Sequence, residues 1–236
     1  MPSFETIGYA VLGGIVPSFI WLYFLLREEA AHPEPKSLIA IAFCAGALAV
    51  PLVIPIEEAA KQHLALFGLA ATSLPVLVSW ALAEETLKYL MAALFILWRR
   101  AVDKAPDYVI YLVTVALGFA AAENALFLLS PLSSGQFLLG FETDNLRFIG
   151  STLLHVVASA AIGFSLAFSW KKSSLARIAY AASGLILAVA LHAAFNALII
   201  SGEGSAALSA FFLVWSATVV FFALFEVLKY FQYRKV

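Results

Sequence analysis

Residues Leu74–Trp98 read LPVLVSWALAEETLKYLMAALFILW. This run is long enough to cross the hydrocarbon core of a bilayer, which takes about 20 apolar residues in a helix. Three charged residues, Glu84, Glu85 and Lys88, nevertheless stand near its middle. A charge at the centre of a membrane helix costs about 2.5–3.5 kcal/mol on insertion scales, so charges there are functional candidates.

Six further apolar runs of similar length flank this one on both sides. Together they predict an all-α, polytopic membrane bundle of about seven transmembrane helices, with residues 1–236 forming a single integral membrane domain. The first residues lack the basic region of a cleaved signal peptide, so we expect the first span to be retained. The predicted spans are Thr6–Leu26, Ser37–Ile56, Leu74–Trp98, Tyr108–Leu129, Leu146–Trp170, Leu175–Ile200 and Ala206–Phe231.

The composition agrees with a membrane protein and excludes several other classes. Hydrophobic residues make up 63% of the chain, charged residues only 12%, and the mean hydropathy is +0.96. Such a chain cannot hide its apolar surface from water, which excludes a soluble enzyme and a disordered tail. A net charge of −1 offers no basic excess for nucleic acid. The single cysteine, Cys44, excludes an internal disulfide framework and a cysteine-based zinc cluster.

The distribution of Lys and Arg between the connections predicts the orientation. If the N-terminus lies outside, eleven of the 14 basic residues fall in cytoplasmic segments. The outer segments then carry only Lys61 and Arg147, and Lys88 lies inside a span. The positive-inside rule therefore predicts an N-out, C-in topology.

Polar residues also stand in three later spans. Counted at about 1.5 Å per residue, Glu84 and the three ionisable residues of these spans lie about 10–15 Å from the outer ends of their helices. Helices that run alternately inward and outward thus bring these groups into one layer, in the outer half of the membrane. The residues are Glu123 and Asn124 in the fourth span, His155 in the fifth, and His192 and Asn196 in the sixth.

Spacing along each helix places these residues on shared faces. Positions four apart lie on the same side of a helix, and small residues around them allow close helix approach. We therefore expect the polar faces to meet inside the bundle. The pairs that share a face are Glu84 with Lys88, Phe119 with Glu123, and His192 with Asn196.

Each of these residues also has a purely structural interpretation. Lys88 with Glu84 or Glu85 could be an ion pair that fixes packing, and Asn124 and Asn196 could join helices by hydrogen bonds. Alignment of all the groups in one layer favours a functional site over this interpretation.

A second Glu-Glu-x-x-Lys pattern occurs at Glu57, Glu58 and Lys61. It follows the second predicted span and falls at the outer surface, where such pairs solvate a helix. We therefore interpret it as structural, in a short amphipathic surface helix.

Several hydrolase signatures are missing from the sequence. There is no His-Glu-x-x-His zinc motif, no Gly-x-Ser-x-Gly nucleophile elbow and no pair of aspartates within the spans. Carboxylate, imidazole and amide groups remain. A buried Glu can act as general base, and a His with an Asn can stabilise an oxyanion.

Taken in order, the polar motifs resemble those of the PrsW family of membrane proteases, which is related to the CAAX-type prenyl endopeptidases and bacteriocin-processing proteins. The resemblance covers the chain from about Pro17 to Asn196. It rests on Glu84-Glu85-x-x-Lys88, Phe119-x-x-x-Glu123-Asn124, His155 and His192-x-x-x-Asn196, with Trp21-Leu-Tyr23 and His32-Pro-Glu-Pro-Lys36 near the N-terminus.

The resemblance implies a glutamic intramembrane endopeptidase in a bacterial plasma membrane. Its expected substrate is a single-pass, membrane-anchored protein similar to an anti-sigma factor, cut near the non-cytoplasmic boundary. By analogy Glu84 is the base that activates water, and Glu85 is a supporting carboxylate. Lys88 neutralises this pair, and His155 orients the water.

The same resemblance assigns the remaining positions. His192 and Asn196 hold the oxyanion, while Phe119, Glu123 and Asn124 support the site. Glu123 departs from the His or Arg that the CAAX branch has at this position, so the resemblance does not fix its role. No cofactor is expected.

Two alternatives stay open from the sequence. A metal-dependent membrane hydrolase would use His155, His192, Glu84 and Glu123 as ligands of zinc, whose preferred donors include imidazole and carboxylate groups. A non-enzymatic ion or proton carrier would use the same buried Glu, Lys and His. The sequence shows no clear inverted repeat, which is the pattern typical of many carriers.

Overall fold

The computed structural model describes residues 2–139, 150–200 and 204–233. Every regular element in these ranges is helical, which confirms the all-α prediction. Each predicted span overlaps one helix, although the start of the fifth, Leu146, lies outside the described residues. The helices are α1 (Phe4–Glu28), α2 (Lys36–Ala65), α3 (Leu74–Phe95), α4 (Ala105–Ser133), α6 (Thr152–Phe168), α7 (Ser174–Ile200) and α8 (Gly204–Tyr233).

Five of these helices are long and apolar enough to cross a membrane: α1, α2, α4, α7 and α8. The protein is therefore a multi-pass membrane protein. Helix α3 has 22 residues but carries Glu84, Glu85 and Lys88 in its middle, and α6 has 17 residues. The number of seven spans and the N-out orientation accordingly remain predictions.

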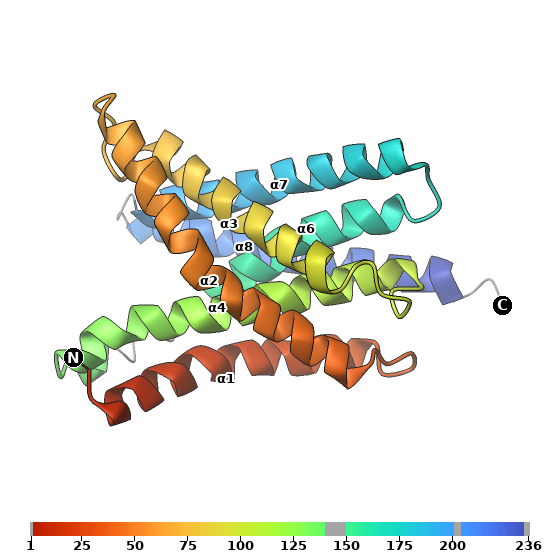
Figure 1. Ribbon diagram of the computed structural model, residues 1–236, viewed down its shortest axis with the longest axis horizontal. Coiled ribbons are helices and arrows are strands. Elements are labelled where there is room, and N and C mark those ends of the chain that lie inside the picture. Colours follow the sequence, from red (N-terminus) through yellow and green to blue (C-terminus); the bar gives the residue numbers. More distant parts are fainter. Residues whose placement is uncertain (1, 140–149, 201–203, 234–236) are drawn as a thin grey trace.

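Consecutive helices run back and forth along the bundle, and the N- and C-termini lie at opposite ends (Figure 1). Helix α4 occupies the centre and packs against α1, α2 and α6, and α6 in turn packs against α7. Nearly all of α4 up to Ala121 is buried, as is most of α6. Small residues such as Gly118 and Ala121 let α2 and α1 approach the α4 backbone closely, which explains the central position of α4.

Helices α2 and α4 cross in backbone contact at two glycines. A Cβ atom at Gly46 would lie 1.8 Å from the carbonyl oxygen of Val115, and one at Gly118 would lie 1.9 Å from that of Phe43. No side chain fits at either position unless the helices separate. Small residues allow such close crossings in membranes, where packing drives helix association.

Helix α2 is longer than the sequence predicts. The predicted span ends at Ile56 and a separate surface helix follows, whereas α2 continues without a break to Ala65. At about 1.5 Å per residue, its 30 residues are longer than the roughly 30 Å hydrocarbon core, so a helix of this length crosses a bilayer at a tilt or projects beyond it. Charged residues mark where a helix leaves lipid, and they do not end the helix.

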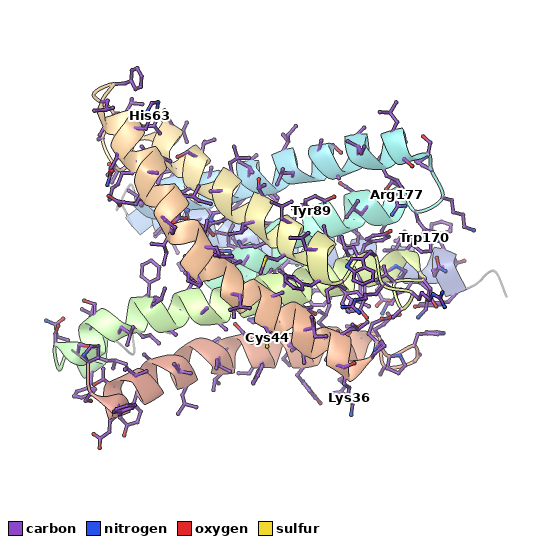
Figure 2. All side chains as sticks on the ribbon, in the orientation of Figure 1. Lys36, Cys44, His63, Tyr89, Trp170 and Arg177 are labelled. Carbon is purple, nitrogen blue, oxygen red and sulfur yellow. The ribbon has the colours of Figure 1, made fainter. Side chains whose placement is uncertain are left out.

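The two ends of the bundle differ in their side chains. His63 lies at the tip of the α2–α3 hairpin, while Trp170 and Arg177 lie at the opposite end (Figure 2). There the guanidinium of Arg177 donates a hydrogen bond to the Tyr108 hydroxyl at 2.5 Å. We call the end that holds the N-terminus and the α2–α3 hairpin the outer end, in line with the predicted topology.

Candidate active site

A fully buried ammonium group stands at the centre of the polar layer. The Nζ atom of Lys88 on α3 lies 2.7 Å from Oε1 of Glu85 and 3.4 Å from Oε2 of Glu84. It also lies 2.7 Å from Nδ1 of His155 on α6. The ring of Phe119 on α4 covers it, with 4.1 Å between Nζ and the ring centroid. A cation removed from water in this way is stabilised by its two carboxylates and the aromatic face.

The contacts of His155 determine its tautomer. An ammonium has only donors, so Nδ1 of His155 accepts the hydrogen bond from Lys88. The proton of the neutral ring is then on Nε2, which lies 2.9 Å from Oε2 of Glu123. Both ring nitrogens are thus occupied, and His155 orients the Glu123 carboxylate.

His192 on α7 contacts both glutamates of α3. Its Nδ1 donates a hydrogen bond to Oε1 of Glu85 at 2.8 Å, and its Nε2 lies 3.8 Å from Oε1 of Glu84. Glu85 is completely buried and accepts a further hydrogen bond from the Ser159 hydroxyl at 3.3 Å. Glu85 therefore joins three helices and has no route to a substrate.

A cavity of about 630 Å³ opens beside this cluster. Glu84 lines it, whereas Glu85 and Lys88 lie behind its wall. The adjacent glutamates of the motif thus have different environments, and only Glu84 can meet water or a substrate. The other site residues predicted from sequence that line the cavity are Phe119, Glu123, His155, His192 and Asn196.

Asn124 lies outside this cavity lining. Its amide donates a hydrogen bond to the Thr152 hydroxyl at 3.0 Å, and its side chain is completely buried. This contact joins α4 to α6, as in the structural interpretation of Asn124.

Glu57 is part of the site, contrary to its interpretation as a surface residue. It lines the cavity, and its carboxyl group lies within hydrogen-bonding reach of that of Glu84. The backbone carbonyl of Glu57 accepts a hydrogen bond from Nε1 of Trp80 at 3.0 Å, which fixes α2 against α3.

The neighbouring residues do follow the structural interpretation, because Lys61 pairs with the exposed Glu58 at 2.5 Å. Helical periodicity could have distinguished Glu57 from Glu58 in the sequence. Val50 and Val53, seven and four residues before Glu57, are buried in the same cavity wall.

Comparison with known proteins identifies the family. Residues 34–225 match the model of a family described as "PrsW family intramembrane metalloprotease". The chain belongs to the PrsW family. It is 30% identical over 198 residues to Protease PrsW of Geobacillus kaustophilus, which covers 82% of this chain and 80% of that protein.

Two other relatives agree with this assignment. The chain is 24% identical over 187 residues to Protease PrsW of Bacillus subtilis, covering 79% of this chain and 80% of the relative. It is 22% identical over 183 residues to Protease PrsW of Clostridioides difficile, covering 77% of this chain and 75% of the relative. No solved structure matches the chain. Membership in the PrsW family makes this protein an intramembrane protease, which favours hydrolysis over the ion-carrier alternative.

The description of the PrsW family as metalloproteases raises the question of a metal site. Glu84, Glu85, His155 and His192 place one potential ligand atom each within 4.8 Å of one another. These donor types suit zinc, but Lys88 occupies Oε1 of Glu85 and Nδ1 of His155 at 2.7 Å each. A divalent cation bound by all four residues would lie against this buried ammonium. The four-residue set therefore does not fit a metal ion through these two atoms while Lys88 is in place.

Proposed function

We propose that this PrsW-family protein hydrolyses a peptide bond of a single-pass, membrane-anchored protein near the non-cytoplasmic membrane boundary. Water activated by Glu84 is the nucleophile. One observation carries this proposal: of the two adjacent glutamates on α3, Glu84 lines the cavity while Glu85 is held behind it. The bacterial relatives support a place in a bacterial plasma membrane.

Glu84 acts first as general base. Its carboxylate takes a proton from water as the water oxygen attacks the carbonyl carbon of the scissile bond. The tetrahedral intermediate collapses when the protonated Glu84 returns that proton to the amide nitrogen. The carbon–nitrogen bond breaks, leaving a new carboxyl terminus and a new amino terminus.

Two groups on α7 stabilise the oxyanion that forms in this step. His192 is four residues before Asn196, so both side chains project from one face of α7, and both line the cavity. Because Glu85 holds Nδ1 of His192, Nε2 is turned toward Glu84. In its protonated form Nε2 donates to the oxyanion together with the Asn196 amide.

Lys88 and His155 act through other residues. Lys88 compensates the charge of Glu85 and lies 3.4 Å from Glu84, which limits the repulsion between the two adjacent carboxylates. His155 donates to Glu123, and this places a second oriented carboxylate in the cavity for the attacking water. His155 thus affects the water through Glu123.

Substrate trapping tests the proposal. A Glu84→Gln variant should bind a substrate without cutting it, because the amide keeps the size of the side chain but cannot take a proton. The variant and wild-type protein are purified from the native membrane, and bound proteins are compared by mass spectrometry. A single-pass protein enriched only with the variant, and shortened only in cells with wild-type protein, is the expected result. Glu58→Gln, at an exposed position of α2, is the matched control.

Zinc-dependent hydrolysis is the second candidate. The family description favours it, and so does the 3.8 Å separation of Glu84 Oε1 and His192 Nε2, close to the roughly 3.4 Å between two ligands of a tetrahedral zinc ion. Glu84 and His192, with Glu123 and His155 from the same cavity wall, would hold the ion, provided that the hydrogen bond between the latter two opens. Bound zinc would polarise the scissile carbonyl and its attacking water.

A further inference from the structure

The cavity has a polar floor and an apolar rim. Glu84, His155 and His192 on the floor are at most 6% exposed. The cavity-lining residues with the greatest exposure are all large and apolar. They are Ile54 (47%) on α2, Leu126 (45%) and Phe127 (53%) on α4, and Ile199 (38%) and Ile200 (44%) on α7.

Such a rim is suited to lipid and to apolar side chains rather than to water. Polar groups would be expected around a mouth that opens only to the aqueous phase, because exposed apolar surface in water is costly. The residues that surround this opening continue the exposed apolar surface of α2, α4 and α7 directly into the candidate active site.

The arrangement of α2 and α4 gives this opening its shape. The two helices touch at Gly46 and Gly118 and then separate toward the outer end of the bundle (Figure 1). Glu57 is eleven residues beyond Gly46, and Phe127 nine residues beyond Gly118, or about 16 Å and 13 Å along each helix. The wedge between the two outer halves is therefore about half as deep as the hydrocarbon core of a bilayer.

We propose that the outer halves of α2 and α4 form a lateral portal, through which the transmembrane segment of the substrate passes from lipid to the cavity. This inference rests on the proposed function. The apolar side chains of the segment then replace contacts with lipid by contacts with Ile54, Leu126 and Phe127, which changes their free energy little.

The segment must unwind before it can be cut, because the carbonyl groups of a helix are hydrogen-bonded within the helix. Its exposed backbone groups then need polar partners, which lipid does not supply and the cavity floor does. The portal thus leads an apolar segment to the point where its backbone can be attacked.

Thiol cross-linking between protein and substrate tests the portal. The probe is a single-pass membrane protein that the wild-type protein cleaves, with one cysteine in the outer half of its transmembrane segment. The protein carries Cys44→Ala, Glu84→Gln and one new cysteine, either Ile54→Cys or Phe127→Cys at the rim. Controls are Ile186→Cys on α7 and Val219→Cys on α8, at apolar positions that are 71% and 68% exposed.

Oxidation should link the rim cysteines to the probe several-fold more than the control cysteines. Equal linkage, or stronger linkage at α7 or α8, would overturn the portal while leaving the proposed function intact, since cleavage of the probe is measured separately. If the wild-type protein cleaves no single-pass protein, both inferences fail.

Reversible closure provides a second test. Ile54→Cys and Leu126→Cys are combined in an active Cys44→Ala background and bridged with a reducible bifunctional thiol reagent. Cleavage of the probe should be lost on bridging and return on reduction. The cleavage rate of each single-cysteine variant, whatever its value before treatment, should not change when the reagent is added. Unchanged cleavage by the bridged protein would exclude entry between α2 and α4.

Discussion

Lys88 on α3 donates a hydrogen bond to Nδ1 of His155 on α6 across 2.7 Å, in a region where neither side chain reaches solvent. This contact fixes the tautomer of His155 and orients Glu123, while the same ammonium compensates Glu85. One buried cation therefore connects the structure of the bundle to the arrangement of its candidate active site. It also gives the first prediction.

Replacing Lys88 with Met should destabilise the protein by about 3–5 kcal/mol, because removal of one partner leaves a buried charge on Glu85. The measurement is thermal unfolding of the purified protein in detergent. Lys61→Met is the matched control, since Lys61 pairs with the exposed Glu58 and its loss should have little effect. Equal stabilities of the two variants would contradict the role of Lys88.

Glu84→Gln should slow cleavage about 10²–10⁴-fold while the protein still folds, because the general base is lost and its shape is kept. Single-turnover cleavage of a trapped substrate measures this rate. Glu85→Gln, unlike Glu84→Gln, should also lower the thermal stability of the protein, since Glu85 binds Lys88, His192 and Ser159. Near-normal cleavage by folded Glu84→Gln protein would refute the assignment of the base.

Glu57→Lys should abolish detectable cleavage, because the new ammonium would lie beside Glu84 and pair with the carboxylate that must accept a proton. Glu58→Lys, one position along the helix and exposed, should cleave at the wild-type rate. The two variants are compared for cleavage rate and for thermal stability. Similar activities would show that Glu57 does not face the reacting groups.

Cleavage should survive treatment with a membrane-permeant chelator, since the proposed water activation uses a carboxylate and needs no Lewis acid. Metal content of the purified protein is measured alongside activity. Stoichiometric zinc, loss of cleavage on chelation and recovery on adding zinc would together favour the metal-dependent mechanism instead.

The new termini of a cleaved substrate should map close to its non-cytoplasmic membrane boundary, within an extended or helix-breaking segment. The reason is that the cavity lies between the outer halves of the helices, if the positive-inside topology holds. Single cysteines at Ser134 and Lys172 check the topology, because only the first should react with an impermeant reagent in intact cells. If Ser134 is labelled as expected and the substrate is nevertheless cut on its cytoplasmic side, the depth assigned to the site is wrong.

The sequence by itself determined the class of the protein and pointed to most of the ionisable residues that line the cavity, with Glu57 as the exception. Long apolar runs require helices in lipid, since a membrane span must satisfy its backbone hydrogen bonds internally. Charges within those runs are too costly to be incidental, which identified Glu84, Glu85, Lys88, Glu123, His155 and His192 before their contacts were known. Helical spacing also placed His192 and Asn196 on one face.

Only the tertiary structure decided which of these groups face the cavity and which lie behind it. Adjacent residues on a helix point about 100° apart, so Glu84 and Glu85 have different partners, and spacing cannot say which of the two faces neighbouring helices. For Glu57 and Glu58, helical spacing places only Glu57 on the face of Val50 and Val53, but it cannot say what that face contacts. Glu57 enters the site because α2 crosses α4 at Gly46 and Gly118, and this crossing angle depends on contacts between helices far apart in the chain.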